Sequence, residues 1–212
     1  MREADNYIKK LIAEGEHQQL DFKFEISDAK KIARSLVAFA NTDGGHLLIG
    51  VKDNGVIAGV RSEEEVYMVE TASHLYCKPE VKFKTKNHIV NNKIVVEIIV
   101  LPSSNKPHFA PGKNDKLTAY IRVNDENKIA NNVIVKVWKR QTQPNGVYLK
   151  FTDTEKKILT FMEKYGELSF SKTCRIAKVN KNRVENILAN FISVGIVEPV
   201  FYNKRVGYKI KT

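Results

Sequence analysis

The stretch FANTDGGHLLIGVKDNG, residues 39–55, decides the fold expected for the front of this chain. It follows an amphipathic segment, residues 27–41, whose apolar side chains recur at helical spacing and which Ser27 can cap. Phosphate-binding glycines stand between a strand and a helix N-terminus, whereas Gly44 and Gly45 follow a helix. The Gly-Lys-Ser/Thr of a P-loop is also absent. We therefore interpret the two glycines as a helix C-cap and turn, and we expect no ATP binding.

The second half of the stretch predicts a buried strand and a tight turn. Residues 46–53, HLLIGVKD, form a short and nearly continuous apolar run, as in a central strand. Asn54-Gly55 is a strong two-residue hairpin signal. Asp53 has two interpretations: it is a turn residue, as Asp often is before Asn-Gly, or it is a catalytic acid.

Helical and strand periods continue on both sides of this stretch. Apolar residues at helical spacing predict a helix ending at Gly15, and the alternation in QLDFKFEI, residues 19–26, predicts a strand with Asp21 and Lys23 facing solvent. Further segments predict a helix at 62–77, two strands within 80–102 and a strand at 119–125. The pattern of residues 130–141 fits a helix or a strand, and Asn132 as a cap favours a short helix. These elements predict an α+β fold: a mixed, mostly antiparallel sheet with flanking helices.

The pattern changes after QTQPNG, residues 141–146, which has the composition of a linker. Three capped amphipathic segments follow, at 152–166, 169–179 and 180–195, and then two strands around Asn203-Lys204. Three helices followed by a β-hairpin is the order of a winged helix-turn-helix. We therefore expect two domains, residues 1–143 and a C-terminal winged-helix domain at 148–212.

Charge and composition narrow the class of partner. The formal net charge is +11, which favours an anionic partner, most often nucleic acid, although a solubility surface is the alternative. The two cysteines lie far apart without CxxC spacing, and the charged N-terminus is no signal peptide. No apolar run reaches the ~20 residues of a membrane helix. We expect a soluble, cytoplasmic protein with no membrane partner.

The tail offers candidate contacts with nucleic acid. In a helix-turn-helix the second helix of the pair enters the major groove, and here that helix starts at Asn180. Its apolar stripe leaves polar side chains that bind phosphates or base edges, and the hairpin adds two cations. The candidate residues are Lys181, Asn182, Arg183, Asn186, Asn190, Lys204 and Arg205. The alternative is a winged helix used for protein contacts or dimerisation.

The front domain resembles the Schlafen AlbA-type domain, described as a DNA-binding module of bacterial regulators and formerly as a divergent ATPase. The resemblance covers residues 11–141 and rests on the following matches: Gly15-Glu16, Asp21-Phe22-Lys23, Phe39-Ala40-Asn41-Thr42, Gly44-Gly45, Gly50-Val51, Asp53, Gly55, NKPHFAPG at 105–112 and AYIRVND at 119–125. Asn124 stands in place of the usual glycine. His108 lies in the Lys-Pro turn, where a surface role is expected and a position facing substrate is the alternative.

The resemblance also implies a possible chemistry. In nuclease-active Schlafen proteins three carboxylates cut RNA with a metal, and by motif they fall on Glu16, Asp21 and Asp53, with Lys23 beside them. Carboxylate oxygens suit Mg²⁺ or Mn²⁺, which activates water and stabilises the charge on phosphorus. Asp21 replaces the family's Glu, and the chain carries one such lobe where the nucleases carry two. A homodimer would restore the second lobe.

The sequence thus favours a DNA-binding transcriptional regulator that binds duplex DNA through the winged helix. The first alternative is a Mg²⁺- or Mn²⁺-dependent ribonuclease acting on RNA, and the second is a non-catalytic protein-interaction module.

Overall fold

The computed structural model describes residues 2–142, 146–202 and 205–212, and the side chains from Asn6 onward within these ranges. The chain divides into two compact units, Met1–Ala130 and Asn131–Thr212. Each unit has its own buried apolar core. None of the described helices is long and apolar enough to cross a membrane.

The front unit is built on a mixed, four-stranded sheet with the order β1-β2-β4-β3. Its strands are β1 (Leu20–Lys23), β2 (Gly45–Ile49), β4 (Lys93–Val100) and β3 (Phe83–Val90). Only β1 and β2 pair in parallel, and the other pairs in this sheet are antiparallel. The predicted mixed, mostly antiparallel sheet is confirmed, and the strand predicted within the opening stretch is central in it.

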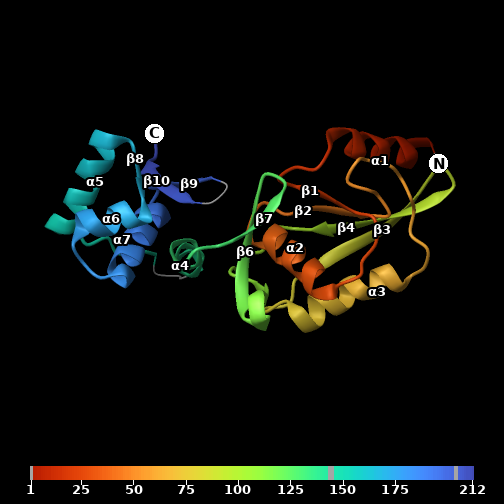
Figure 1. Ribbon diagram of the computed structural model, residues 1–212, viewed down its shortest axis with the longest axis horizontal. Helices are drawn as coiled ribbons and strands as arrows, with labels where there is room; N and C mark the ends of the chain where they lie inside the picture. The colour runs from red at the N-terminus through yellow and green to blue at the C-terminus, as the bar shows by residue number, and fades with distance from the viewer. Residues whose placement is uncertain (1, 143–145, 203–204) are drawn as a thin grey trace. The chain divides into compact units, whose positions relative to one another are not determined.

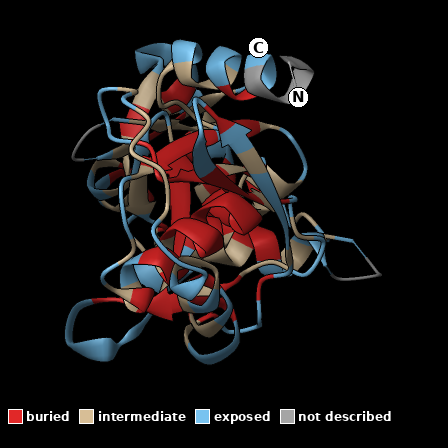
Figure 2. Cartoon of the chain, turned by 90° about the vertical axis from the view of Figure 1, so that its right-hand side faces the viewer, coloured by how far each residue is buried: buried red, intermediate tan, exposed pale blue. Residues whose placement is uncertain are grey.

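Helices cover both faces of this sheet (Figure 1). Helix α1 (Arg2–Glu14) lies on one face, while α2 (Ala29–Asn41) and α3 (Glu64–Thr71) lie on the other. Figure 2 shows that buried residues are concentrated in the middle of the unit, whereas α1 is largely exposed on its outer side. A second sheet, with the order β5-β6-β7, packs against α2. Its strands are β5 (Phe109–Pro111), β6 (Leu117–Val123) and β7 (Glu126–Ile129).

The Gly44-Gly45 turn joins α2 to β2, as the sequence predicts. Gly44 has a φ of +73°, and its N–H donates to the carbonyl of Phe39 at 3.0 Å. A Cβ on Gly44 would meet the carbonyl oxygen of Val100 at 2.6 Å, and one on Gly45 would meet the Phe39 ring at 2.5 Å. The turn therefore needs glycine both for its backbone conformation and for the close approach of neighbouring atoms.

The predicted turn at Asn54-Gly55 is also present. Val51 and Ile57 form an antiparallel bridge, and the Lys52 N–H donates to the carbonyl of Val56 at 3.0 Å. The Asn54 side chain accepts from the Val56 N–H at 3.2 Å. The tip is an exposed, self-contained turn.

The second unit holds α4 to α7 and a three-stranded antiparallel sheet with the order β8-β10-β9. Its elements are α4 (Asn132–Gln141), α5 (Asp153–Tyr165), β8 (Glu167–Ser169), α6 (Phe170–Ala177), α7 (Lys181–Ser193), β9 (Val197–Phe201) and β10 (Val206–Ile210). The predicted cap of the third helix is present, since the Asn180 side chain accepts from the Arg183 N–H at 2.9 Å.

The segment whose pattern fitted a helix or a strand is the helix α4, as predicted, but its N-cap is Asn131 and not Asn132. The predicted boundary puts this segment in the front domain. In the structure Val133 and Val137 are buried in the core of the second unit, because α4 packs along α7. The helix therefore adds its apolar face to the later helices. Residues 143–145 of the predicted linker lie outside the described residues.

Candidate nucleic-acid interface and buried carboxylates

Two of the three carboxylates implied by the resemblance come together. The Glu16 carboxylate accepts from the backbone N–H of Phe22 at 2.7 Å, which ties the loop after α1 to β1. Partial burial and a hydrogen bond with Asp21 raise the pKa of Glu16 above its usual range. The carboxyl groups of Glu16 and Asp21 therefore lie next to each other at the start of β1.

Asp21 is buried, although alternation along its strand predicts that it faces solvent. It is 4% exposed and is paired with cations on both sides. The Lys23 ammonium lies 3.1 Å from one carboxylate oxygen, and the Arg122 guanidinium lies 3.4 Å from the other. Arg122 itself is almost completely buried, because β6 brings it over β1. A buried carboxylate needs such partners, so Asp21 is neutralised within the chain.

Asp53 lies in the exposed tip of the turn after β2. Among the residues that the structure describes, no group of three His, Cys, Asp or Glu side chains is placed where it could hold a metal ion. The Mg²⁺ or Mn²⁺ site at Glu16, Asp21 and Asp53 stays a prediction, and of its three carboxylates the structure brings Glu16 and Asp21 together. Glu16 and Asp21 form a pair stabilised by Lys23 and Arg122, and Asp53 has the geometry of a turn residue.

A different carboxylate lies at the centre of the sheet face that α1 covers. Glu97 is completely buried, and its oxygens accept from the Tyr7 hydroxyl at 2.7 Å, from His46 Nδ1 at 2.7 Å and from His88 Nε2 at 2.8 Å. Burial favours the neutral acid, but the three hydrogen bonds outweigh it and lower the pKa of Glu97 to about 2. This network joins α1 to three neighbouring positions of the sheet.

The Glu97 network predicts acid sensitivity of the front unit. Its pKa is below the unfolded value of about 4.5, so its contribution is complete above pH 4.5 and is lost as the pH falls towards 2. We expect the free energy of unfolding of the front unit to fall by about 3 kcal/mol across this window. Amide hydrogen exchange of β4 measures this loss. Glu97→Gln should remove most of this pH dependence. Glu70→Gln, at an exposed carboxylate, is the control, and an unchanged pH profile for Glu97→Gln would contradict the assignment.

The candidate cations of α7 lie on its exposed surface. Lys181 and Arg183 are exposed in the first turn of the helix. The guanidinium of Arg183 lies 3.6 Å from the Glu155 carboxylate of α5, with half of its side chain open to solvent. Glu155 is buried whereas Arg183 is half exposed, so the open side of the guanidinium remains accessible to a phosphate.

Two of the three candidate asparagines of α7, Asn182 and Asn186, already accept hydrogen bonds from α4. Lys136 of α4 donates to the side chain of Asn182, and Arg140 of α4 donates to that of Asn186 at 2.8 Å. Between them Lys136 pairs with Glu185 at 2.8 Å. Helix α4 thus lies along the polar side of α7 that the sequence assigns to phosphates or base edges. Of the three asparagines, only Asn190 has no such partner among the described residues.

Of the two candidate cations in the β9–β10 hairpin, Lys204 lies outside the described residues. Arg205 stacks on the ring of Tyr202, with 4.7 Å from its guanidinium carbon to the ring centroid, and lies 3.8 Å from Glu167. Its side chain is 63% exposed, so it is available to an anionic partner.

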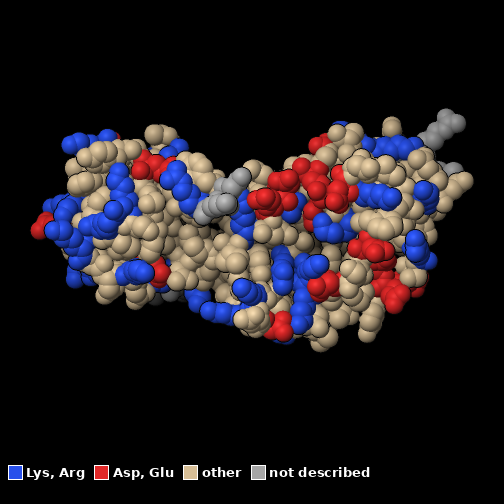
Figure 3. All heavy atoms as spheres, viewed as in Figure 1, with Lys and Arg blue, Asp and Glu red and all other residues tan. Residues whose placement is uncertain are grey.

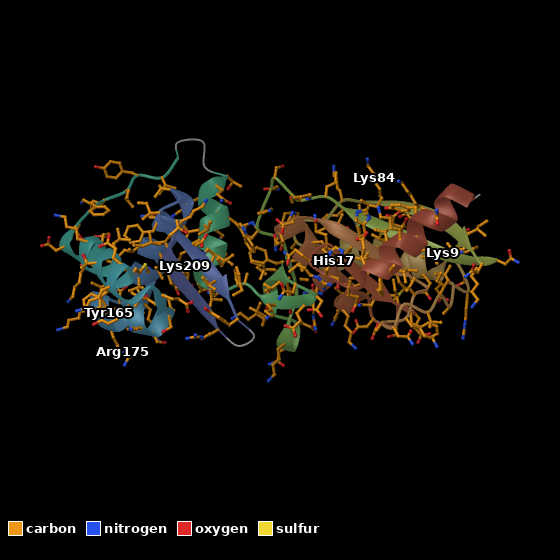
Figure 4. All side chains as sticks on the ribbon, turned by 90° about the horizontal axis from the view of Figure 1, so that it is seen from above. Lys9, His17, Lys84, Tyr165, Arg175 and Lys209 are labelled. Carbon is orange, nitrogen blue, oxygen red and sulfur yellow. The ribbon has the colours of Figure 1, made fainter. Side chains whose placement is uncertain are left out.

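Most of the net positive charge of the chain lies in the second unit. Asn131–Thr212 contains 16 Lys and Arg and 6 Asp and Glu, a formal net charge of +10. Met1–Ala130 contains 19 and 18, a net charge of +1. On the face shown in Figure 3, the charged atoms of the second unit are mostly basic, while acidic patches lie on the front unit. Arg175 of α6 and Lys209 of β10, labelled in Figure 4, belong to this basic set.

Residues 16–131 match the model of the protein family described as Schlafen, AlbA_2. No curated protein matches the chain. Among solved structures, the DIP2311 protein from Corynebacterium diphtheriae is similar at 19% identity and a TM-score of 0.49, over 77% of this chain and 38% of that one. This chain thus spans about two fifths of the length of the DIP2311 chain. The N-terminal domain of a protein from Nitrosomonas europaea, named as related to the ATP-dependent DNA helicase RecG, is similar at 20% identity and a TM-score of 0.40, over 59% and 91%.

Proposed function

The chain belongs to the Schlafen AlbA_2 family, and from this premise we propose that it is a nucleic-acid-binding protein, a transcriptional regulator that contacts duplex DNA through residues 131–212. The observation that carries the proposal is the net charge of +10 on this unit. Phosphate neutralisation supplies most of the affinity of such proteins for DNA, so a small unit with this charge is suited to a polyanion.

The order of elements supports a winged helix in this unit. Helix α5, strand β8, helices α6 and α7, and the hairpin of β9 and β10 follow one another, with β8 paired to β10. We propose that α6 and α7 form the helix-turn-helix and that the β9–β10 hairpin is the wing.

The packing of α4 changes which residues we propose for contact. Lys181 and Arg183 at the start of α7, and Arg205 in the hairpin, are exposed cations suited to phosphates. Asn182 and Asn186 hold α4 against α7, and reading bases would cost them those hydrogen bonds. We therefore propose that backbone contacts dominate the affinity.

Replacing Lys181 and Arg183 by alanine together should weaken binding to duplex DNA and flatten its dependence on salt. Each lost phosphate contact lowers the slope of log K against log[salt] by about 0.9, so the double variant should lose about 2. Fluorescence anisotropy with a labelled duplex across a salt series measures both quantities. A parallel series with single-stranded RNA tests the preference for duplex DNA.

Lys156→Ala/Lys157→Ala is the matched control, because it removes the same charge from two exposed positions of α5. If both double variants lose the same affinity for DNA, only the net charge matters, and the assigned interface is contradicted. Absence of binding to any nucleic acid at low salt would contradict the proposed function itself.

We also propose that the protein acts as a homodimer, since a regulator that binds two half-sites needs two copies. Sedimentation equilibrium of the full chain tests this. A monomer at all concentrations, with and without duplex DNA, would rule it out.

A further inference from the structure

A pocket of about 610 Å³ opens in the front unit, beside the turn that precedes β5. Two of its lining residues, Ser103 and His108, are hydrogen-bonded to each other, with 2.7 Å between Ser103 Oγ and His108 Nε2. Much of the remaining wall is apolar, formed by Pro79, Val81, Phe83, Ile99, Leu101 and Pro102.

His108 is held from several sides. It is 4% exposed, so the surface role expected for it is wrong. The Asn41 side chain of α2 accepts from the backbone N–H of His108 at 2.8 Å and donates to its carbonyl at 2.9 Å. Asn41 also donates to the carbonyl of Tyr120 at 2.9 Å, which fixes the same amide to β6. The imidazole thus stands on a backbone with little freedom to move.

The proton positions follow from the partners. His108 Nδ1 lies 2.8 Å from the carbonyl oxygen of Pro79, which can only accept, so Nδ1 carries the proton. In the neutral ring Nε2 is then the acceptor, and the Ser103 hydroxyl donates to it. Burial lowers the pKa of His108 below its usual value, although the Pro79 carbonyl opposes this, so the ring is neutral at pH 7.

The geometry points to Ser103 as a nucleophile activated by His108, with the Pro79 carbonyl orienting the base. A hydroxyl bonded to a base that is itself oriented by a third group is the arrangement that nucleophilic serine catalysis requires. The apolar wall suits an ester with an apolar acyl group. Asn105, Lys82 and Lys84 line the same pocket, and the backbone N–H of Asn105 donates to Ser103 Oγ at 3.0 Å. Lys84 is labelled in Figure 4.

The reaction needs only the ester and water. Ser103 Oγ forms a bond with the carbonyl carbon while its proton passes to His108 Nε2. The bond to the leaving oxygen breaks, and Nε2 returns the proton to that oxygen. Water then attacks the acyl-serine with the same base, which releases the acid and regenerates the serine hydroxyl. Nδ1 keeps its proton and its bond to Pro79 throughout.

The test is covalent labelling of the full chain with an alkyl fluorophosphonate, followed by peptide mass spectrometry. We expect the phosphonyl group on Ser103, no labelling of Ser103→Ala, and hydrolysis of p-nitrophenyl butyrate by the unlabelled protein. Ser104→Ala is the matched control, because Ser104 is an exposed neighbour that lines the same pocket, and it should label at the wild-type rate.

His108→Gln should slow the labelling by at least about 100-fold, since general bases contribute this much or more. If this variant does not fold, heat-denatured wild-type protein serves as the control in which His108 is no longer held beside Ser103. The denatured protein should not be labelled. Absence of labelling on folded wild-type protein would overturn the inference. Equal labelling of Ser103 and Ser104, or labelling of Ser103 that persists without His108 or after denaturation, would also overturn it.

Discussion

Arg122→Met is expected to lower the free energy of unfolding of the front unit by about 3–5 kcal/mol, because it removes the buried one of the two cations that pair with the Asp21 carboxylate. The guanidinium lies 3.4 Å from Asp21 and donates to the carbonyl of Leu20 at 3.2 Å and to the side chain of Asn127 at 3.1 Å. It also lies over the Phe39 ring, 5.2 Å from its centroid. One side chain thus joins β1, β6, β7 and α2.

Amide hydrogen exchange of β1 and β6 measures this loss within the full chain. Amide hydrogen exchange of α7, whose apolar face belongs to the core of the second unit, reports whether that unit is unaffected. Arg122→Met/Asp21→Asn should recover part of the loss, since the unpaired charge is then gone. If the double variant loses more unfolding free energy than the two single variants lose together, the ion-pair explanation is contradicted.

Gly44→Ala is expected to cost the front unit about 2–5 kcal/mol. A left-handed backbone costs a residue with a Cβ about 1–2 kcal/mol, and the added atom would also press on the Val100 carbonyl at 2.6 Å. Gly15→Ala is the matched control, because Gly15 has a φ of +72° and no atom within 4 Å of the Cβ position.

The control should cost only the backbone share, about 1–2 kcal/mol. Urea unfolding measured by amide hydrogen exchange of β2 compares the two variants, and exchange of α7 again follows the other unit. Equal losses at Gly44 and Gly15 would show that backbone strain explains both and that the close approach to Val100 carries no cost.

The parts of the fold that follow from local physics were predictable. The period of the apolar residues indicates α2 and β2, and positive φ at a turn calls for glycine, so Gly44 and the Asn54-Gly55 turn could be placed from sequence. Strand alternation failed at Asp21, because it assigns faces but cannot show that Arg122, 101 positions later, lies over the sheet. Burial of a charge depends on its partner, and the partner comes from another strand.

The same limit applies to the candidate sites. Three neighbouring strands carry His46, His88 and Glu97. Only the register of β2, β3 and β4 brings the two imidazoles to the Glu97 carboxylate. The sequence places helix α4 at the end of the front domain. In the structure its buried valines belong to the core of the second unit, and its cations donate hydrogen bonds to the asparagines of α7. A chain position does not show which core an amphipathic helix will complete.

The sequence was sufficient to identify the α+β class, the central strand, the glycine turn, the basic tail and the resemblance to Schlafen AlbA-type domains, because composition, period and motif are properties of neighbouring residues. Tertiary structure decided which charges are buried and which residues meet: Asp21 with Arg122, Glu97 with its histidines, and Ser103 with His108. Hydrogen bonds and ion pairs form over about 3 Å, and only the folded chain brings residues that are distant in sequence within that range.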